Sequence, residues 1–258
     1  MKNNVYFFGH GNPIFALQPN RYTQSWQKAV SDNPRPDSIV CISAHWMTPH
    51  LSVTSMENPK TIHDFSGFPK ELYEINYPVK GNPLLAQQIV DILKQDHCVK
   101  DYDWGIDHGS WSVLKYIYPD ASIPTIQISL NRGQGLLFHY ELGKKLSVLR
   151  DQNILIVASG NTVHNLYEAN WRDNTNPDPR ALEFDKLLKE KLFNRDKNSF
   201  VNLLADYPNL SKWAHPSIEH LLPLCVAFGA SDEKDKLSIV CEGIDMSSIS
   251  MTSLAWKV

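Results

Sequence analysis

The sequence has few of the features that mark secreted, membrane-bound or nucleic-acid-binding proteins. Its four cysteines stand singly among 258 residues with no CxxC pair, so we expect reduced thiols rather than a disulfide framework. No stretch approaches the roughly 18 apolar residues of a membrane span, and the N-terminal apolar run is too short for a signal peptide. Lys and Arg total 25 against 28 Asp and Glu, without a block of like charge. These absences predict a cytoplasmic protein with no nucleic-acid or membrane partner.

Several common catalytic motifs are also missing. The chain has no Walker A motif, no GxGxxG and no GxSxG, which disfavours phosphoryl transfer, dinucleotide redox chemistry and serine hydrolysis. The segment 159–161, Ser-Gly-Asn, comes nearest to a nucleophile turn, but its residue order does not fit one. We therefore expect no organic cofactor.

What the sequence does contain is an alternation of short apolar runs with longer stretches of helical period. This alternation predicts an α/β fold with a central, mostly parallel or mixed sheet flanked by helices. The predicted strands are 5–8, 38–43, 125–129, 154–159, 237–241 and 250–256. The predicted helices are 22–30, 83–93, 111–118, 136–149, 180–193 and 218–228. Without a repeat or a Gly/Ser linker, we expect one catalytic domain spanning 1–258.

One connection is too long for an ordinary loop. Residues 47–81 hold four prolines and little periodicity. Long connections in compact domains are usually functional, so we expect this segment to contribute to a site.

Histidines follow three of the predicted strands, each after small residues. His10, His45 and His164 stand just beyond the runs 5–8, 38–43 and 154–159. Ligands of open α/β sheets bind beyond the carboxyl ends of the strands, so these imidazoles are expected to converge. Because imidazole is the commonest ligand for Zn, Fe and Cu, the pattern predicts a metal site at this edge of the sheet.

Two further positions extend this histidine group. His220 opens the predicted helix 218–228 beside Glu219, and helix neighbours point about 100° apart, so one of the two should reach the site. We favour His220 and keep Glu219 as the reserve. His108, in a glycine-flanked turn, and His63, in the long connection, are weaker candidates. The other histidines are interpreted as structural: His50, His97, His139 and His215.

At these residues the sequence resembles the class III extradiol ring-cleavage dioxygenases, and within them the 4,5-DOPA extradiol dioxygenase branch. The matches occur in a fixed order along nearly the whole chain, which makes them far more specific together than singly. They are the segments 9–13, 43–46, 56–65, 67–69, 105–111, 158–161, 163–166, 219–220, 222–224 and 242–246.

The resemblance implies one divalent metal ion per chain. Its ligands would be His10, His45 and His220, with His164 as a fourth ligand or an acid/base residue. Other members of the wider class use two histidines and a glutamate, so Glu219 stays open as the third ligand. Fe(II) is the ion expected for dioxygenase activity, while a site of three or four histidines suits Zn(II) equally well.

The resemblance also implies the reaction. Such an enzyme inserts O2 into a catecholic substrate similar to L-DOPA, here by 4,5-cleavage to a semialdehyde. His164 would be the main acid/base residue and His108 a second polar group that orients the substrate, since histidine titrates near operating pH. The ring would lie near three aromatic side chains: Trp46, Phe65 and Phe68.

Two other readings of the same residues remain open. A zinc-dependent hydrolase would use an open metal position to activate water, with Glu219 as its base. A non-catalytic metal-binding protein is the second alternative. Candidates for holding a substrate carboxylate are Lys60, Arg132 and Arg172. The residues fix neither the oligomeric state nor the orientation of the ring that decides which bond breaks.

Overall fold

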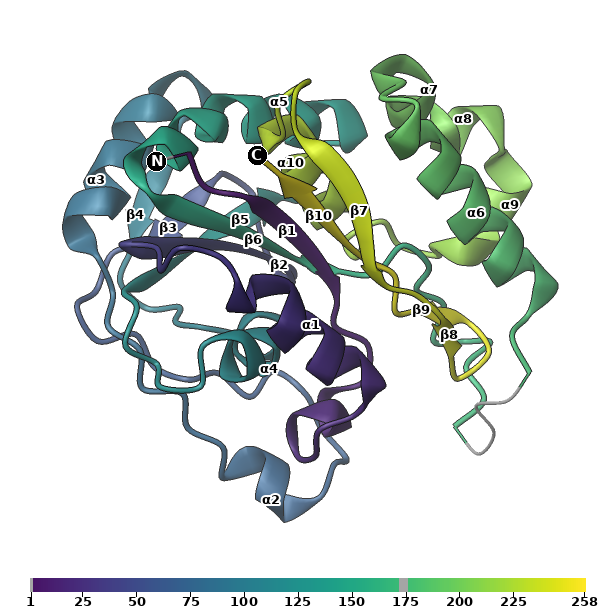
Figure 1. Ribbon diagram of the computed structural model, residues 1–258, viewed down its shortest axis with the longest axis horizontal. Helices are drawn as coiled ribbons and strands as arrows, with labels where there is room; N and C mark the ends of the chain where they lie inside the picture. The colour runs from purple at the N-terminus through teal and green to yellow at the C-terminus, as the bar shows by residue number, and fades with distance from the viewer. Residues whose placement is uncertain (1, 172–175) are drawn as a thin grey trace.

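The computed structural model describes residues 2–171 and 176–258, and its centre is an eight-stranded mixed sheet between helical layers (Figure 1). The strand order is β4-β3-β5-β2-β6-β1-β10-β7. Its strands are β1 (Val5–Gly9), β2 (Ser38–Thr48), β3 (Ser52–Thr54), β4 (Val99–Asp101), β5 (Thr125–Asn131), β6 (Ile154–Gly160), β7 (Lys236–Cys241) and β10 (Ser253–Lys257). A small separate sheet pairs β8 (Ile244–Asp245) with β9 (Ile249–Ser250).

The middle of the large sheet is parallel and its margins are mixed. β5, β2, β6 and β1 run side by side in the same direction, whereas β10 is antiparallel to β1 and β7 is antiparallel to β10. The sequence prediction of a mostly parallel or mixed sheet is therefore confirmed. Because β2, β6 and β1 are neighbours, the residues that follow them meet at one edge of the sheet.

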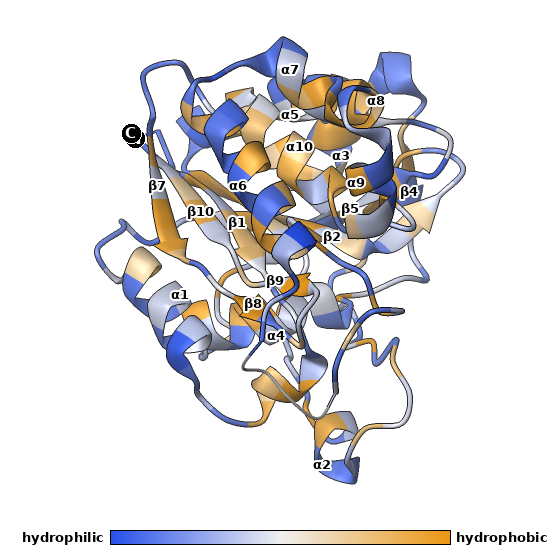
Figure 2. Cartoon of the chain, turned by 90° about the vertical axis from the view of Figure 1, so that its right-hand side faces the viewer, coloured by the Kyte–Doolittle hydropathy of each residue, from blue (hydrophilic) through white to orange (hydrophobic). Residues whose placement is uncertain are grey.

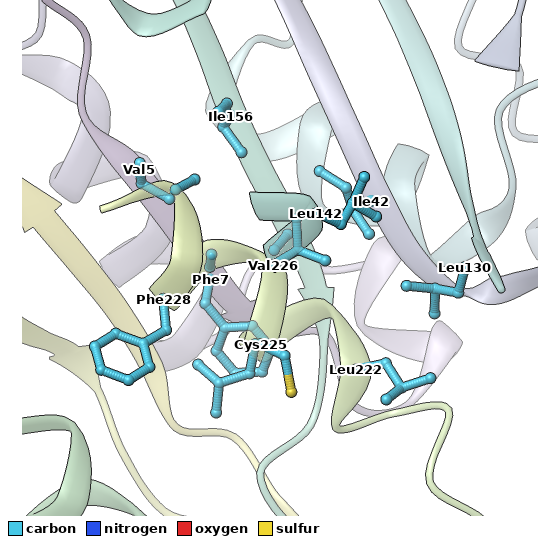
Figure 3. Close-up of a cluster of buried hydrophobic side chains, with 14 of the residues drawn as sticks. Val5, Phe7, Ile42, Leu130, Leu142, Ile156, Leu222, Cys225, Val226 and Phe228 are labelled. Carbon is cyan, nitrogen blue, oxygen red and sulfur yellow. The ribbon is translucent and has the colours of Figure 1, made fainter. Parts of the chain in front are cut away.

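The central strands are covered on both faces, which explains their continuous apolar runs. Val5 and Phe7 of β1 belong to one buried cluster, and Tyr6 and Phe8 belong to another on the opposite face. Figure 3 shows the first cluster, where Phe7 lies among side chains of α10 and of the neighbouring strands.

The helices form two layers on the sheet (Figure 1). On the face of the first cluster lie α3 (Pro83–Ile92), α5 (Leu136–Leu146), α6 (Pro179–Phe193) and α10 (Leu222–Ala230), and on the other lie α1 (Arg21–Ser31) and α4 (His108–Ile117). In Figure 2, α10 is mostly hydrophobic, as expected of a helix that is buried on all sides. Hydrophobic and hydrophilic residues alternate along α6, as expected of a helix with one face in solvent. The shorter helices are α2 (Lys70–Tyr73), α7 (Lys197–Val201), α8 (Leu203–Asp206) and α9 (Pro208–Ala214). The 3-10 helices are Pro13–Ala16, Lys94–Asp96 and Ser147–Gln152.

Two helix boundaries differ from the sequence prediction, and both affect the site. The helix predicted from 218 begins at Leu222, so His220 lies in the turn before α10 rather than inside a helix. The helix predicted from 111 begins earlier, at His108, because the Asp107 side chain accepts a hydrogen bond from the Ser110 backbone N–H at 3.1 Å.

Other elements were not predicted at all. The strands β3 and β4 are three residues long, and α7, α8 and α9 are four to seven residues long, too short to show a period. The predicted strand 250–256 is divided between β9 and β10. Across residues 2–171 and 176–258, no helix reaches the length and hydropathy that crossing a bilayer demands.

Candidate metal centre

Three of the predicted histidines meet at the carboxyl edge of the parallel strands. His10 directly follows β1, His45 lies in β2 within its register shift against β5, and His220 lies in the turn before α10. One ligand atom from each lies within 4.8 Å of the others, and the Nε2 atoms of His10 and His45 are 3.2 Å apart. His10 and His220 are buried and His45 is nearly so. Of the three strand-end histidines expected to converge, His10 and His45 are in this group, while His164 groups with Glu219 and His220.

A glycine at the end of β6 lets His220 reach this group. A Cβ atom on Gly160 would lie 2.2 Å from the backbone oxygen of His220, so any side chain would push the turn away. The next residue, Asn161, donates its backbone N–H to the same oxygen at 2.9 Å. The turn is thus fixed against the strand that it must approach.

The Nδ1 atoms of His10 and His220 are engaged by residues behind the rings. His10 Nδ1 is 2.9 Å from the Ser159 hydroxyl, which itself donates to the Gly109 carbonyl, so the imidazole is the donor. His220 Nδ1 is 3.1 Å from Glu219 Oε1, and His220 Nε2 is buried without a partner among the described residues. Buried polar atoms normally have a partner, and a metal ion bound by the three imidazoles would supply one for this Nε2.

His45 and His108 share one carboxylate. Asp64 Oδ2 lies 3.2 Å from His45 Nδ1, and Asp64 Oδ1 lies 3.0 Å from His108 Nδ1. The second contact is close, but it is not aligned as a hydrogen bond. The rings of His45 and His108 are 3.9 Å apart between centroids. His108 therefore stands beside the three-histidine group rather than on its far side.

The surroundings set different pKa values in this group. Burial, followed by repulsion from neighbouring imidazoles, holds the pKa values of His10 and His220 well below their usual range, which keeps both neutral. Burial alone would lower the pKa of His45, but Asp64 and Asp107 raise it. Burial would raise the pKa of Asp64, and contact with His108 and His45 overrides this and holds it well below its usual range. The neutral imidazoles of His10 and His220 can bind a divalent ion without first losing a proton.

His164 occupies a different place from the other three. Its ring stacks on that of His220, with centroids 3.4 Å apart and planes 8° apart, and it groups with Glu219 and His220. Its backbone N–H donates to the Ala214 carbonyl at 2.9 Å. Burial, with His215 as the next contribution, lowers the pKa of His164 to about 3. The side chain is thus a neutral imidazole at pH 7, able to accept a proton.

The histidines open into a cavity of about 300 Å³. One wall holds the imidazoles and Asp64, and the rest is largely apolar. The apolar lining consists of Phe65, Phe68, Leu166, Trp171, Met246 and Ile249. A planar aromatic molecule would find ring faces on one side and imidazoles on the other. The long connection 47–81 supplies part of this wall, as its length predicted.

Several other candidates lie elsewhere. Trp46 is buried and stacks on Trp104 with centroids 5.6 Å apart, away from the cavity lining. His63 Nε2 lies 2.9 Å from the Ile75 carbonyl, and His63 and Lys60 line a separate surface hollow. The exposed Arg132 donates to the Met47 carbonyl. Arg172 lies outside the described residues.

Sequence reasoning missed two residues that contact the histidines. Asp64 and Ser159 were given no role, although both stand in segments that carried the resemblance. A carboxylate beside His63 in a long connection was the available signal for Asp64. Ser159 gave none, because a serine that ends a buried strand is ordinary.

Comparison with known proteins agrees with this geometry. Residues 9–255 match the family described as the catalytic LigB subunit of aromatic ring-opening dioxygenase. The chain is 44% identical over 252 residues to 4,5-DOPA dioxygenase extradiol of Escherichia coli K12, covering 96% of this chain and 92% of that protein. It is 36% identical to the protein of the same name from Mirabilis jalapa, covering 92% and 90%. A crystal structure of an uncharacterized E. coli K12 protein superimposes with a TM-score of 0.87 at 39% identity, covering 99% and 100%.

Proposed function

Since the chain belongs to the LigB family of aromatic ring-opening dioxygenases and is an extradiol ring-cleaving enzyme, we propose that its substrate is a catechol related to L-DOPA. The products would be those of 4,5-cleavage, a ring-opened semialdehyde. The proposal rests on one observation above all. Three imidazoles, two of them buried, bring one nitrogen each to within 4.8 Å of the others on the wall of an aromatic-lined cavity.

In this proposal His10, His45 and His220 hold one divalent ion. The family is metal-dependent. Two observations support these three ligands: His220 Nε2 is buried without a partner among the described residues, and each Nδ1 atom contacts a polar side chain, which leaves Nε2 for the ion. When bound, the ion supplies the Lewis-acid and redox chemistry of the reaction. Fe(II) is the proposed catalytic ion, with Zn(II) as an alternative occupant of the same ligands.

His164 is the proposed acid/base residue. Its ring lines the cavity and is neutral at pH 7, so it can exchange a proton with a catechol hydroxyl there. Burial lowers its pKa to about 3, which makes it a weaker base than an exposed histidine. Its ring lies flat against His220, so it acts from beside the three-histidine group in this proposal, and a fourth-ligand role is the alternative. His108, buried next to His45, would orient the substrate oxygen atoms.

The substrate ring is proposed to lie between these imidazoles and the side chains of Phe65 and Phe68. Both phenylalanines come from the long connection, and their rings meet edge to face with centroids 5.4 Å apart. We further propose that the chain acts in the cytoplasm as one catalytic domain spanning 1–258. The four free cysteines support a reducing compartment.

The test is to remove metal, reconstitute anaerobically with Fe(II) or Zn(II), add L-DOPA and then air, and follow O2 uptake with the visible absorbance of the product. We expect oxygen-dependent colour with Fe(II). His164→Ala should slow it by about 10²-fold or more, the usual contribution of a positioned acid/base group. His50→Ala, which changes an exposed histidine outside the cavity, is the matched control.

Two results would decide against the proposal. If several catechols gave no turnover with either ion, the substrate class would be wrong. Turnover without O2 consumption would instead favour the zinc-hydrolase alternative. For that reaction Glu219 would have to act as base, yet its Oε1 accepts from Ser217 and contacts the rear of His220, which supports the dioxygenase.

A further inference from the structure

Among the described residues, the carboxylate of Asp64 has three polar contacts, all to two histidines of the site. Oδ2 lies 3.2 Å from His45 Nδ1, and Oδ1 lies 3.0 Å from His108 Nδ1 and accepts the His108 backbone N–H at 2.9 Å. Asp64 lies on the long connection, outside any helix or strand, and 18% of its side chain is exposed. An irregular segment thus contacts the histidine group through this carboxylate, next to Phe65, whose ring lies 5.3 Å from that of His108 between centroids.

The backbone contact holds the carboxylate independently of the two imidazoles. His108 is the first residue of the ten-residue helix α4, whose N-terminal N–H groups favour a negative charge. The N-cap position is already taken by Asp107, so Asp64 is an additional carboxylate at this helix end. The first backbone N–H of α4 therefore fixes the position of the Asp64 carboxylate.

A glycine brings His45 close enough to share this carboxylate. A Cβ atom on Gly109 would lie 2.9 Å from His45 Cδ2 and 2.4 Å from Ser43 Oγ. Any other residue here would move the start of α4 away from β2. The close approach of helix and strand explains how one carboxylate reaches both rings.

We propose that Asp64 is a positioning residue that holds His45 and His108 in one tautomer, with the proton on Nδ1 and the Nε2 lone pair free. An ionised carboxylate repels the lone pair of a facing imidazole nitrogen and attracts its N–H, so it favours the proton on both Nδ1 atoms, which lie 3.2 and 3.0 Å from its oxygens. His45 then offers Nε2 toward His10 Nε2, as a metal ligand must. This inference rests on the proposed function, because it takes His45 as a ligand of the ion.

The role differs from that of the other rear contacts. Ser159 holds only His10, and Glu219 holds only His220, among the three ligand histidines. Asp64 contacts a ligand histidine and the histidine proposed to orient the substrate. Loss of its charge should therefore change metal binding and substrate turnover together.

The test is Asp64→Asn, which keeps the size of the side chain but replaces one acceptor oxygen with an NH2 donor. The metal-free proteins are titrated with Co(II) in competition with a chelator, and the visible spectrum of bound Co(II) is recorded. We expect 10- to 100-fold weaker binding and a changed spectrum, the usual effect of losing an outer carboxylate. Asp103→Asn, at an exposed carboxylate in the turn before α4, is the control and should match wild type.

Asp64→Glu distinguishes charge from fit, and circular dichroism of each metal-free protein reports folding. The glutamate keeps an acceptor-only group, so its Co(II) affinity should lie between those of wild type and Asp64→Asn. Unchanged affinity and spectrum in Asp64→Asn, or equal losses in both variants, would overturn the role of Asp64 alone. Failure of the wild type to bind Co(II) would overturn the proposed metal centre itself.

Discussion

Where the parallel strands begin, Arg150 lies fully buried and ties together three segments. Its Nε donates to the Asn3 carbonyl, and its Nη1 donates to the Ala230 carbonyl and lies 2.8 Å from Asp235 Oδ2. Nη2 is left without a partner among the described residues. These contacts join the residue Asn3 before β1, the last residue of α10 and the residue before β7.

Where the same strands end, the buried polar groups include imidazoles that contact a protein partner through Nδ1. The Nδ1 atoms of His10 and His220 are engaged from behind, while Nε2 atoms face one another or a cavity. An ion pair with protein partners on both sides holds the fold together, whereas imidazoles with one free nitrogen each are ready for a further ligand. The comparison teaches that burial alone does not separate a structural group from a functional one, and that the difference is whether the polar atoms face protein partners or converge with other ligand atoms on a cavity.

The largest effect that we expect is the loss of metal binding on substitution of His10. His10→Ala should abolish Co(II) or Fe(II) binding and lower ring-cleavage activity well beyond the 10- to 100-fold of an outer contact. The free energy of unfolding of the metal-free protein should fall by no more than about 2 kcal/mol, because the lost ring has one protein hydrogen bond through Nδ1. Isothermal titration and urea unfolding measure the two quantities. Full metal binding by this variant would remove His10 from the ligand set.

At the opposite end of the parallel strands, Asp235→Ala should lower stability and leave activity unchanged. Leaving Arg150 buried without its carboxylate should lower the free energy of unfolding by about 3–5 kcal/mol, with activity per folded molecule unchanged. Urea unfolding and steady-state turnover are the measurements. The double variant Arg150→Met/Asp235→Leu should regain most of the loss, since no charge is then buried. If it stayed as unstable as the single variant, packing rather than charge would be the cause.

Much of the fold could be predicted from sequence because both faces of the sheet are covered. Strands such as 5–8 and 154–159 read as continuous apolar runs, and their order along the chain gave the α/β class. The short elements β3, β4 and α7 to α9 carry too few residues for a period. The start of α10 was misplaced because apolar spacing alone cannot distinguish the turn at His220 from a first helical turn.

The sequence gives a positional reason for a site residue where a strand carries it, whereas the loop residues Phe65 and Phe68 were named only through the family resemblance. His10 and His45 follow the strand rule, and the structure brings them together with His220. Asp64 lies in a stretch of the long connection that is outside any helix or strand, so no spacing in the sequence could place it. His63, the neighbour of Asp64 and a weaker candidate from the sequence, instead contacts the Ile75 carbonyl and lines a different surface hollow.

A third kind of buried imidazole, that of His139, should make the stability of the fold depend on pH. His139 has both ring nitrogens bonded to backbone, Nε2 to the Asn131 N–H and Nδ1 to the Gly135 carbonyl, and burial lowers its pKa to about 4. Between pH 6.5 and 4 the unfolded chain binds a proton here that the folded one does not. Stability should therefore fall as pH falls through this window, by up to about 1.4 kcal/mol per pH unit. Urea unfolding of metal-free wild type and His139→Gln at several pH values should show a shallower slope in the variant; equal slopes would contradict the assignment.

The smallest effect is expected three residues from Asp235. Asp232 pairs with Lys2 at 2.8 Å, but 41% of its side chain is exposed. A hydrogen bond from Lys2, followed by the Lys234 backbone N–H, lowers the pKa of Asp232 to about 2, so its contribution is present near neutral pH and is lost as the carboxylate gains a proton in acid. Water and salt screen such a pair, and Asp232→Ala should lower the free energy of unfolding by less than about 1 kcal/mol.

Measured beside Asp235→Ala in the same urea titration, Asp232→Ala isolates what burial adds. Both variants remove an aspartate that pairs with a cation at 2.8 Å, one side chain nearly fully buried and one partly exposed. The difference between them should also survive 0.5 M NaCl, because salt weakens only the exposed pair. Equal losses would mean that the turn between α10 and β7, rather than the buried guanidinium, makes this end of the sheet stable.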